Sequence, residues 1–299
     1  MDDLVLGFAV SVTASLAAFL LGRAVGVRVG QRTSNLLALI SFVGLLAYLA
    51  FIWDQAVLVR WLPFSNAVVL GNWLPLEAAF VGGLAVTTRT TGVRRWLPVI
   101  ALQLAAMVTV IWPLLGATPR CGDSWYDSTT CLQTTNKTCS AAAAATLLKL
   151  HGIPATEQEM AELCLTRNGT NWLGVYRGLK RKTAGTAWDV EVFNDSAEEV
   201  CQRPRPAILF VGLEHNRPHG SQLQTEFGWR PGMQHSVVLL RSYPGNLLEI
   251  AEPSELGRDY WTTTDFKQLY RGQGLRLVRN PSAQTHRAFE VASRTAPPR

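Results

Sequence analysis

Residues 133–153 read QTTNKTCSAAAAATLLKLHGI, and this stretch decides how the C-terminal part of the chain folds. The five consecutive alanines make residues 140–150 a strong helix former, and Gly152 and Pro154 are typical stop signals after a helix. The sequence therefore predicts a helix over 140–150 with Cys139 at its N-terminus. A thiol at that place lies near the positive end of the helix dipole, which favours the thiolate.

Two more helices are expected after this one, followed by a series of strands. Thr156 and Glu159 have the spacing of a capping box, and Asn171 opens another helical stretch. The strands are expected at 188–193, 207–211, 235–241, 247–251 and 275–279. The Pro244–Gly245 turn joins the third and fourth strands as a hairpin. Helices followed by strands predict an α+β domain.

The N-terminal part of the chain has a different composition. Positions 1–118 hold only seven of the 28 basic residues and four of the 22 acidic residues of this 299-residue chain. A break of this size indicates two regions in different solvents. It excludes a soluble single-domain enzyme.

Three apolar runs are long enough for a membrane span, which takes about 20 residues. These charge-free runs lie at 4–22, 33–53 and 96–118. A fourth segment, 66–88, is interrupted by Glu77, and a carboxylate in the middle of a bilayer costs about 2.5 to 3.5 kcal/mol on insertion scales. The charges of the loops therefore decide whether this fourth segment crosses.

The arginines of the N-terminal part form two clusters, one after the first run and one after segment 66–88. The clusters are Arg23, Arg28 and Arg32, and Arg89, Arg94 and Arg95. Basic loops stay in the cytoplasm, and both clusters do so only if segment 66–88 crosses the membrane. We therefore expect four transmembrane helices in the plasma or inner membrane, with the C-terminal domain on the extracytoplasmic side.

The predicted organisation has four parts. They are a membrane anchor at 1–118, a linker rich in small polar residues at 119–130, a folded domain at 131–280 and a flexible tail at 281–299. The expected partners are a peptide or protein substrate and the lipid bilayer. No nucleic acid, metal or cofactor is expected.

Four residues of the folded domain are candidates for catalysis. Cys139 is the candidate nucleophile, and Gln133, six residues earlier, brings an amide that can stabilise an oxyanion. His235 begins a strand, where a base can reach a thiol on a helix. Glu252 ends the neighbouring strand of the hairpin, so its carboxylate can orient the imidazole of His235. The alternatives are a buried core cysteine, a turn histidine and a solvated carboxylate.

The other histidines and acids are weaker candidates. His151 is expected at a helix C-terminus, which favours its charge, and His286 lies in the tail. His215 and His219 have zinc-like spacing, but the intervening Pro218 interrupts any helix that would align them. If Glu252 is not the orienting acid, one of the loop acids, Glu255 or Asp259, is expected in its place.

The motifs around these candidates resemble those of the bacteriocin-processing, double-glycine leader peptidases, a papain-like family. QTTNKTCSAAAAA is similar to the Q-x5-C-G-P-A-A-L-A motif of that family, and GMQHSVVLL to its histidine strand. AEPSELGRDYWTTTDFKQLYRG resembles its Asp-Pro-x-x-G strand end and closing helix. The resemblance covers residues 130–280. It implies a papain-like cysteine peptidase with Cys139 as nucleophile, His235 as base, Gln133 in the oxyanion hole and Glu252 as orienting acid.

The chain departs from the family pattern at two places. Ser140 and Ala141 stand where the family has Gly-Pro, and Glu252 stands in the place of an aspartate. The resemblance implies cleavage after small residues such as Gly-Gly or Gly-Ala. Two other interpretations stay open, a transglutaminase-like acyl transferase and a non-catalytic binding domain.

The five cysteines bear on the compartment. An odd number fits an oxidising environment if one thiol stays reduced. Disulfides between Cys121 and Cys131 and between Cys164 and Cys201 would leave Cys139 free. The alternative is four unpaired, buried thiols.

Overall fold

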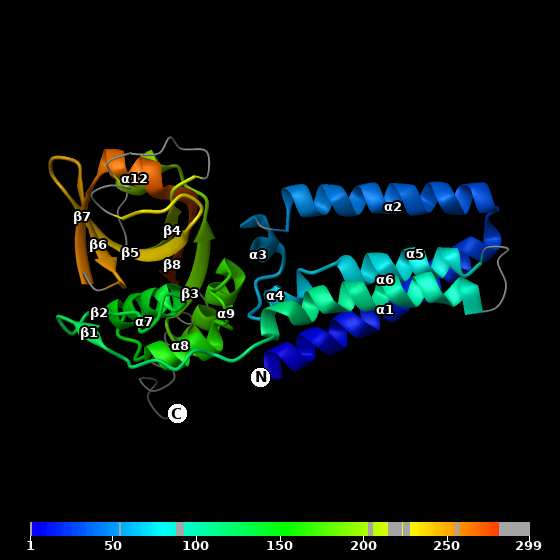
Figure 1. Cartoon of the computed structure of the whole chain (residues 1–299), viewed down its shortest axis with the longest axis horizontal. Coiled ribbons are helices and arrows are strands. Elements are labelled where there is room, and N and C mark those ends of the chain that lie inside the picture. The colour runs from blue at the N-terminus through cyan, green and yellow to red at the C-terminus, as the bar shows by residue number, and fades with distance from the viewer. Residues whose placement is uncertain are drawn as a thin grey trace, which may run out of the picture. The chain divides into compact units, whose positions relative to one another are not determined.

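The computed structural model describes residues 2–53, 55–87, 93–202, 206–214, 223, 228–254 and 257–280 (Figure 1). The chain divides into two compact units, Met1–Gly116 and Ala117–Arg299. The predicted tail at 281–299 lies outside the described residues.

Among the described residues of the N-terminal unit, four helical segments are long and apolar enough to cross a membrane. They are Asp2–Arg28, Gln31–Phe51, Ala67–Ala85 and Trp96–Leu114. The first two segments are α1 and α2. The third comprises α4 (Ala67–Leu70) and α5 (Leu74–Ala85), and the fourth comprises most of α6 (Val93–Ile111) and a short 3₁₀ turn. The interrupted segment 66–88 is therefore a candidate span, as predicted. A short helix that was not predicted, α3 (Val57–Trp61), lies between the second and third segments.

Helices α1 and α5 pack against each other through glycines. A Cβ atom added at Gly22 would meet the backbone carbonyl of Phe80, and one added at Gly83 would meet the backbone of α1. Small residues allow membrane helices to approach this closely. Earlier in α1, a Cβ atom added at Gly7 would meet the side chain of Val69 in α4, the helix that precedes α5. The two helices therefore run parallel, and their C-terminal ends lie at the same end of the unit.

A polar residue that interrupts the third candidate span is paired inside the unit. The side chain of Asn72 donates from Nδ2 to Thr109 Oγ1 of α6 at 2.8 Å, and its Oδ1 accepts from the N–H of Leu74 at 3.2 Å. Polar groups in hydrocarbon need such partners. Glu77 lies in the first turn of α5, and its Oε1 is buried with no hydrogen-bond partner in the described part of the chain.

Three helices precede the large sheet of the C-terminal unit, as predicted. They are α7 (Cys139–Leu150), α8 (Glu157–Leu163) and α9 (Trp172–Thr183). Thr156 caps α8, where its hydroxyl accepts from the N–H of Glu159 at 3.1 Å, and Asn171 caps α9 by accepting from the N–H of Leu173 at 2.8 Å. The alanines at 141–145 are fully buried, so α7 is the central helix of the unit.

An antiparallel sheet follows, with the strand order β3-β8-β4-β5-β6-β7. Its strands are β3 (Trp188–Phe193), β4 (Ala207–Gly212), β5 (Gln234–Tyr243), β6 (Leu247–Glu252), β7 (Gly257–Thr262) and β8 (Tyr270–Arg279). All five predicted strands are present, and β5 and β6 form the predicted hairpin. Strand β7 was not predicted. Helix α12 (Thr263–Leu269) is the closing helix that the resemblance implies.

Helices cover both faces of the sheet (Figure 1). Helices α7, α8 and α9 lie on one face, and α12 lies on the other. On the α12 face a core cluster joins the sheet to α12 and to α10 (Ala197–Gln202). Its members include Leu209, Val237, Ile250, Val200 and Phe266. The predicted α+β class is confirmed.

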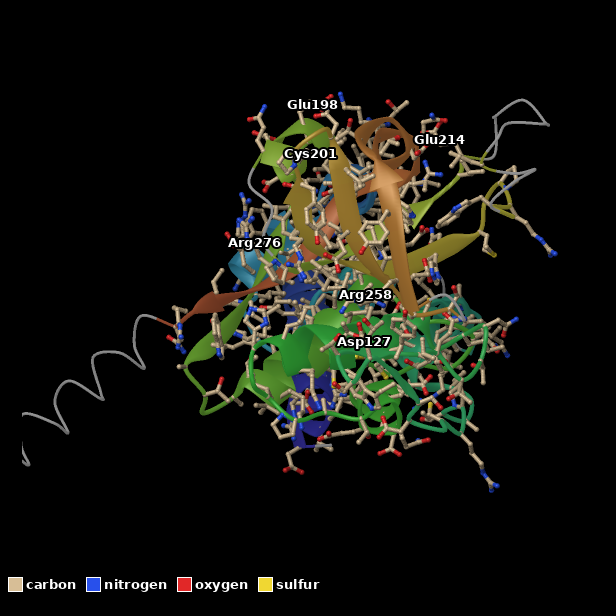
Figure 2. The ribbon with its side chains drawn as sticks, turned by 90° about the vertical axis from the view of Figure 1, so that its left-hand side faces the viewer. Asp127, Glu198, Cys201, Glu214, Arg258 and Arg276 are labelled. Atoms are coloured by element: carbon tan, nitrogen blue, oxygen red, sulfur yellow. The ribbon has the colours of Figure 1, made fainter. Side chains whose placement is uncertain are left out.

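The stretch predicted as a linker, 119–130, is structured and belongs to the C-terminal unit. It contains most of a hairpin formed by β1 (Trp125–Tyr126) and β2 (Thr130–Cys131). The turn includes Asp127 at a φ of 46°, in the left-handed region of the backbone map. This conformation is usually indicated in a sequence by glycine, so an aspartate there does not predict the turn clearly. Nη2 of Arg258 in β7 lies 3.1 Å from Oδ2 of Asp127, so the hairpin docks on the edge of the sheet (Figure 2).

The two predicted disulfides are wrong, because all five cysteines are free. Cys164 is buried between α8 and α9. Cys201 packs on the core cluster at α10, on the opposite face of the sheet (Figure 2). Cys121 is engaged instead with Glu157: burial, together with the charge and a hydrogen bond of this acid, raises the pKa of the Cys121 thiol to about 11. Burial also raises the pKa of Cys131.

Candidate active site

Cys139 is the first residue of α7. The fully buried alanines behind it let α7 approach the middle of the sheet closely, at β4, β5 and β6. Side chains no larger than a methyl group make this approach possible. The N-terminus of α7, with its thiol, is thereby held against the start of β5.

His235 and Glu252 lie on the neighbouring strands β5 and β6. Val238 pairs with Ala251 in the antiparallel register, so the end of β6 lies beside the start of β5. Nε2 of His235 is 2.6 Å from Oε1 of Glu252, and both side chains are largely buried. The structure thus brings these two candidate residues into contact.

His235 lowers the pKa of the Cys139 thiol through a hydrogen bond and through its charge, and the two groups lie at the N-terminus of α7 and the start of β5, respectively. Glu252 occupies Nε2, so Nδ1 is the ring nitrogen that remains for the sulfur. The order of contacts is therefore thiol, imidazole, carboxylate. In this arrangement a carboxylate fixes the ring and a base faces the nucleophile.

Burial and pairing act in opposite directions on these two groups. Burial disfavours the thiolate, yet the hydrogen bond and charge of His235, with the N–H of Ser236, hold the pKa of Cys139 below its usual range. Burial likewise disfavours the imidazolium, but hydrogen bonds to Cys139 and Glu252 raise the pKa of His235 to about 10. Both shifts favour the form of the pair in which Cys139 is a thiolate and His235 is an imidazolium. A thiolate is the nucleophilic form of cysteine, and an imidazolium is a proton donor.

Gln133 lies in the loop before α7. Its backbone N–H donates to the carbonyl oxygen of Pro253 at 2.6 Å, so the loop is tied to the residue that follows Glu252. The side-chain Oε1 of Gln133 is buried and has no hydrogen-bond partner among the residues that the structure describes. The unpaired amide oxygen can accept a hydrogen bond from a donor group of a bound substrate, and the NH₂ group of the same amide is the part that can donate to an oxyanion.

A buried carboxylate fixes the loop next to Gln133. Glu157, which is fully buried, accepts from the N–H of Thr134 at 2.7 Å and from its hydroxyl at 2.5 Å. The backbone N–H of Glu157 in turn donates to Oδ1 of Asp123 at 2.9 Å. Buried charges are tolerated when they are hydrogen-bonded in this way. The first residue of α8 thus sets the path of the chain into the site.

The other candidate residues lie elsewhere or outside the described residues. Asp259 on β7 accepts from Nε1 of Trp261 at 2.6 Å, and Nδ1 of His151 lies 2.8 Å from the carbonyl of Leu147. Glu255, His215, His219 and His286 lie outside the described residues. Within the described ranges, no group of three or more His, Cys, Asp or Glu side chains could hold a metal ion.

Sequence reasoning missed three residues at the site. Oγ of Ser140 and Oγ of Ser236 are 2.8 Å apart and buried, and the rings of Trp229 and His235 meet edge to face with centroids 6.0 Å apart. Each serine directly follows a candidate catalytic residue, which is a signal that could have been used. Trp229 carries no such signal.

The sequence matches no family model and no curated protein. Solved structures similar to it include the peptidase domain of Streptococcus ComA, a bi-functional ABC transporter involved in a quorum sensing pathway. The two are 20% identical, the match covers 50% of this chain and 96% of that domain, and the TM-score is 0.39. A double glycine motif protease from an AMS/PCAT transporter, solved with its leader peptide, is 16% identical over 55% of this chain and 95% of its own, with a TM-score of 0.38. The Streptococcus mutans ComA peptidase domain is 19% identical, and the match covers 50% of this chain and 98% of that domain, with a TM-score of 0.34.

Proposed function

We propose that the C-terminal unit is a cysteine peptidase that cleaves peptide bonds through Cys139. The observation that carries the proposal is the 2.6 Å contact between His235 and Glu252, together with the effect of His235 on the pKa of the Cys139 thiol. In this proposal His235 is the general acid and base, and Glu252 orients its ring. Gln133 donates to the oxyanion.

The first step is acylation of the enzyme. The thiolate of Cys139 attacks the carbonyl carbon of the scissile peptide bond, and the carbonyl oxygen becomes an oxyanion. The amide of Gln133 and the backbone N–H of Cys139 donate hydrogen bonds to this oxyanion. As the C–N bond breaks, the imidazolium of His235 gives its proton to the leaving amine. The products are a thioester on Cys139 and a neutral imidazole.

The second step is hydrolysis of the thioester. Neutral His235 takes a proton from a water molecule, whose oxygen attacks the thioester carbonyl. The C–S bond breaks, the acid product leaves, and Cys139 returns as the thiolate beside the imidazolium. The Glu252 carboxylate accepts a hydrogen bond from Nε2 throughout, which keeps Nδ1 directed at the sulfur.

The proposed substrates are peptides or proteins with small residues before the scissile bond, such as Gly-Gly or Gly-Ala. This specificity rests on the motifs that resemble the double-glycine leader peptidases.

We propose that residues 1–118 anchor the peptidase in the plasma or inner membrane, with the peptidase domain at 131–280 on the extracytoplasmic side. Four candidate spans and the two arginine clusters support this topology. The parallel packing of α1 and α5 is consistent with it, because both helices then cross from outside to inside.

Incubation of the full chain in detergent micelles with a peptide library, and with a labelled amine, tests the proposal. Peptides with new N-termini and a transient thioester on Cys139, identified by mass spectrometry, are the expected result. Cys139→Ala should abolish both, whereas Cys201→Ala, which removes another half-buried thiol away from the site, should keep them. Cleavage by Cys139→Ala would overturn the assignment. Amine adducts without cleavage would favour an acyl transferase. Peptide binding without any reaction would favour a non-catalytic binding domain.

A further inference from the structure

Two serines connect the candidate nucleophile to the candidate base. Ser140 follows Cys139 in the first turn of α7, and Ser236 follows His235 in β5. Their Oγ atoms are 2.8 Å apart, and the two residues are 4% and 2% exposed. A hydrogen bond between two buried hydroxyls is shielded from competition with water. It joins the helix to the strand at the point where the reacting groups meet.

The same two serines also contact the sulfur. Oγ of Ser140 lies 4.0 Å from Sγ of Cys139, within hydrogen-bond reach of a sulfur atom, and the backbone N–H of Ser236 is among the groups that lower the pKa of Cys139. A hydroxyl has one proton to donate and two lone pairs. If the Ser236 hydroxyl donates to Ser140, the proton of Ser140 is left for the sulfur. The two hydroxyls then form a short chain that ends on the thiolate.

We propose that Ser140 and Ser236 are a positioning pair, which holds the Cys139 sulfur against His235 and shares in binding its negative charge. Removing either hydroxyl leaves the other without its buried partner, so each single loss disturbs the same chain. The inference rests on the proposed function, in which the thiolate is the nucleophile. Its readout, however, is the ionisation of the thiol and not the cleavage of a peptide.

The test compares Ser140→Ala, Ser236→Ala and the double variant with the unchanged full chain in detergent. The rate of Cys139 alkylation by iodoacetamide is followed against pH by peptide mapping. In each single variant the pH at which the alkylation rate is half-maximal should rise by about half to one unit. At a pH below that midpoint, the fraction of Cys139 present as thiolate should then be about three to ten times smaller. The double variant should move little further than the larger single shift, because both changes break one chain.

Thr146→Val is the matched control. Thr146 is a buried hydroxyl on the same helix, and it accepts from the N–H of Cys131 at 2.9 Å, away from the thiolate. Its loss should lower the unfolding temperature without moving the alkylation midpoint. Serine variants that likewise lose stability with an unmoved midpoint would overturn the positioning pair. Shifted midpoints in a chain that cleaves no peptide would support the pair and overturn the proposed function.

Discussion

Nε2 of His235 lies 2.6 Å from Oε1 of Glu252, although 17 positions separate the two residues. The β5–β6 hairpin creates this contact by placing the last residue of β6 beside the start of β5. Oε1 of Glu252 also accepts from the N–H of Ser254 at 3.0 Å, which fixes the carboxylate from its own chain. The ring of Trp229 lies edge to face with that of His235, so the pair is partly shielded from solvent.

Glu252→Gln should lower peptidase turnover by about tenfold or more and leave substrate affinity nearly unchanged, because an amide holds the imidazole less firmly in the productive tautomer. Glu252→Asp keeps a carboxylate and should retain more activity than Glu252→Gln. Steady-state kinetics on a cleaved peptide measure both effects. Asp259→Asn, which alters a carboxylate bound to Trp261, should leave turnover unchanged. Unaltered turnover in Glu252→Gln would remove Glu252 from the site.

Gln133→Ala should reduce kcat by about 10²- to 10³-fold with little change in KM, the usual effect of losing one oxyanion donor. The backbone bond from Gln133 to Pro253 survives this change, so the loop should keep its path. Gln158→Ala is the control, because its Oε1 accepts from the N–H of Cys121 away from the thiol. Equal kinetics in the two variants would argue against an oxyanion role for Gln133.

The pH dependence of cleavage follows from the paired charges. Because the pKa of Cys139 is lowered, the thiolate persists as the pH falls below the ordinary thiol range of about 8.5, and activity is lost only below the lowered value. Because the pKa of His235 is raised to about 10, the proton for the leaving amine is lost only as the pH rises toward 10. A pH profile of kcat/KM should therefore show a broad plateau through neutrality. A narrow optimum near pH 8.5 would contradict the ion pair.

Reporter fusions test the topology. A fusion after Arg120 should be active only outside the cytoplasm, and fusions near Arg32 or Arg94 only inside it, because the arginine clusters set the orientation. A cytoplasmic signal after Arg120 would mean that the segment with Glu77 does not cross.

Gly257→Ala should destabilise the C-terminal unit by about 1 to 3 kcal/mol. Gly257 has a φ of 66°, and an added Cβ would meet the ring of Tyr126 in the β1–β2 hairpin. Gly245→Ala separates the two causes, because Gly245 has a φ of 88° but nothing within 4 Å of an added Cβ. Thermal unfolding of the full chain should show the larger loss at Gly257. Equal losses would mean that the Tyr126 contact contributes nothing.

The sequence predicted the strands that lie in the core and the hairpin that joins β5 to β6, because their apolar residues and turn signal are local. It missed β7, an edge strand whose GRDYWT sequence alternates weakly. It also interpreted 119–130 as a linker, since the docking of that hairpin depends on Arg258, more than a hundred residues away. Long-range contacts of this kind leave no periodicity in a single sequence.

The same distinction holds at the site. Cys139, His235 and Glu252 could be chosen because helix ends and hairpin register are local features. The tie from Gln133 to Pro253 and the pair of Ser140 with Ser236 join segments far apart in the chain, so only the folded structure reveals them. The disulfide prediction failed because it paired four of the five cysteines from their number alone. The number of cysteines does not indicate where in the fold each one lies.

Alkylation of the full chain at pH 6 tests whether Cys139 and His235 form a thiolate–imidazolium pair. Peptide mapping after brief iodoacetamide treatment should show Cys139 reacting at least about tenfold faster than Cys201, whose pKa burial raises. His235→Ala should bring Cys139 down to the rate of Cys201. Equal rates in the unchanged chain, or a fast Cys139 in His235→Ala, would show that His235 does not hold Cys139 as a thiolate.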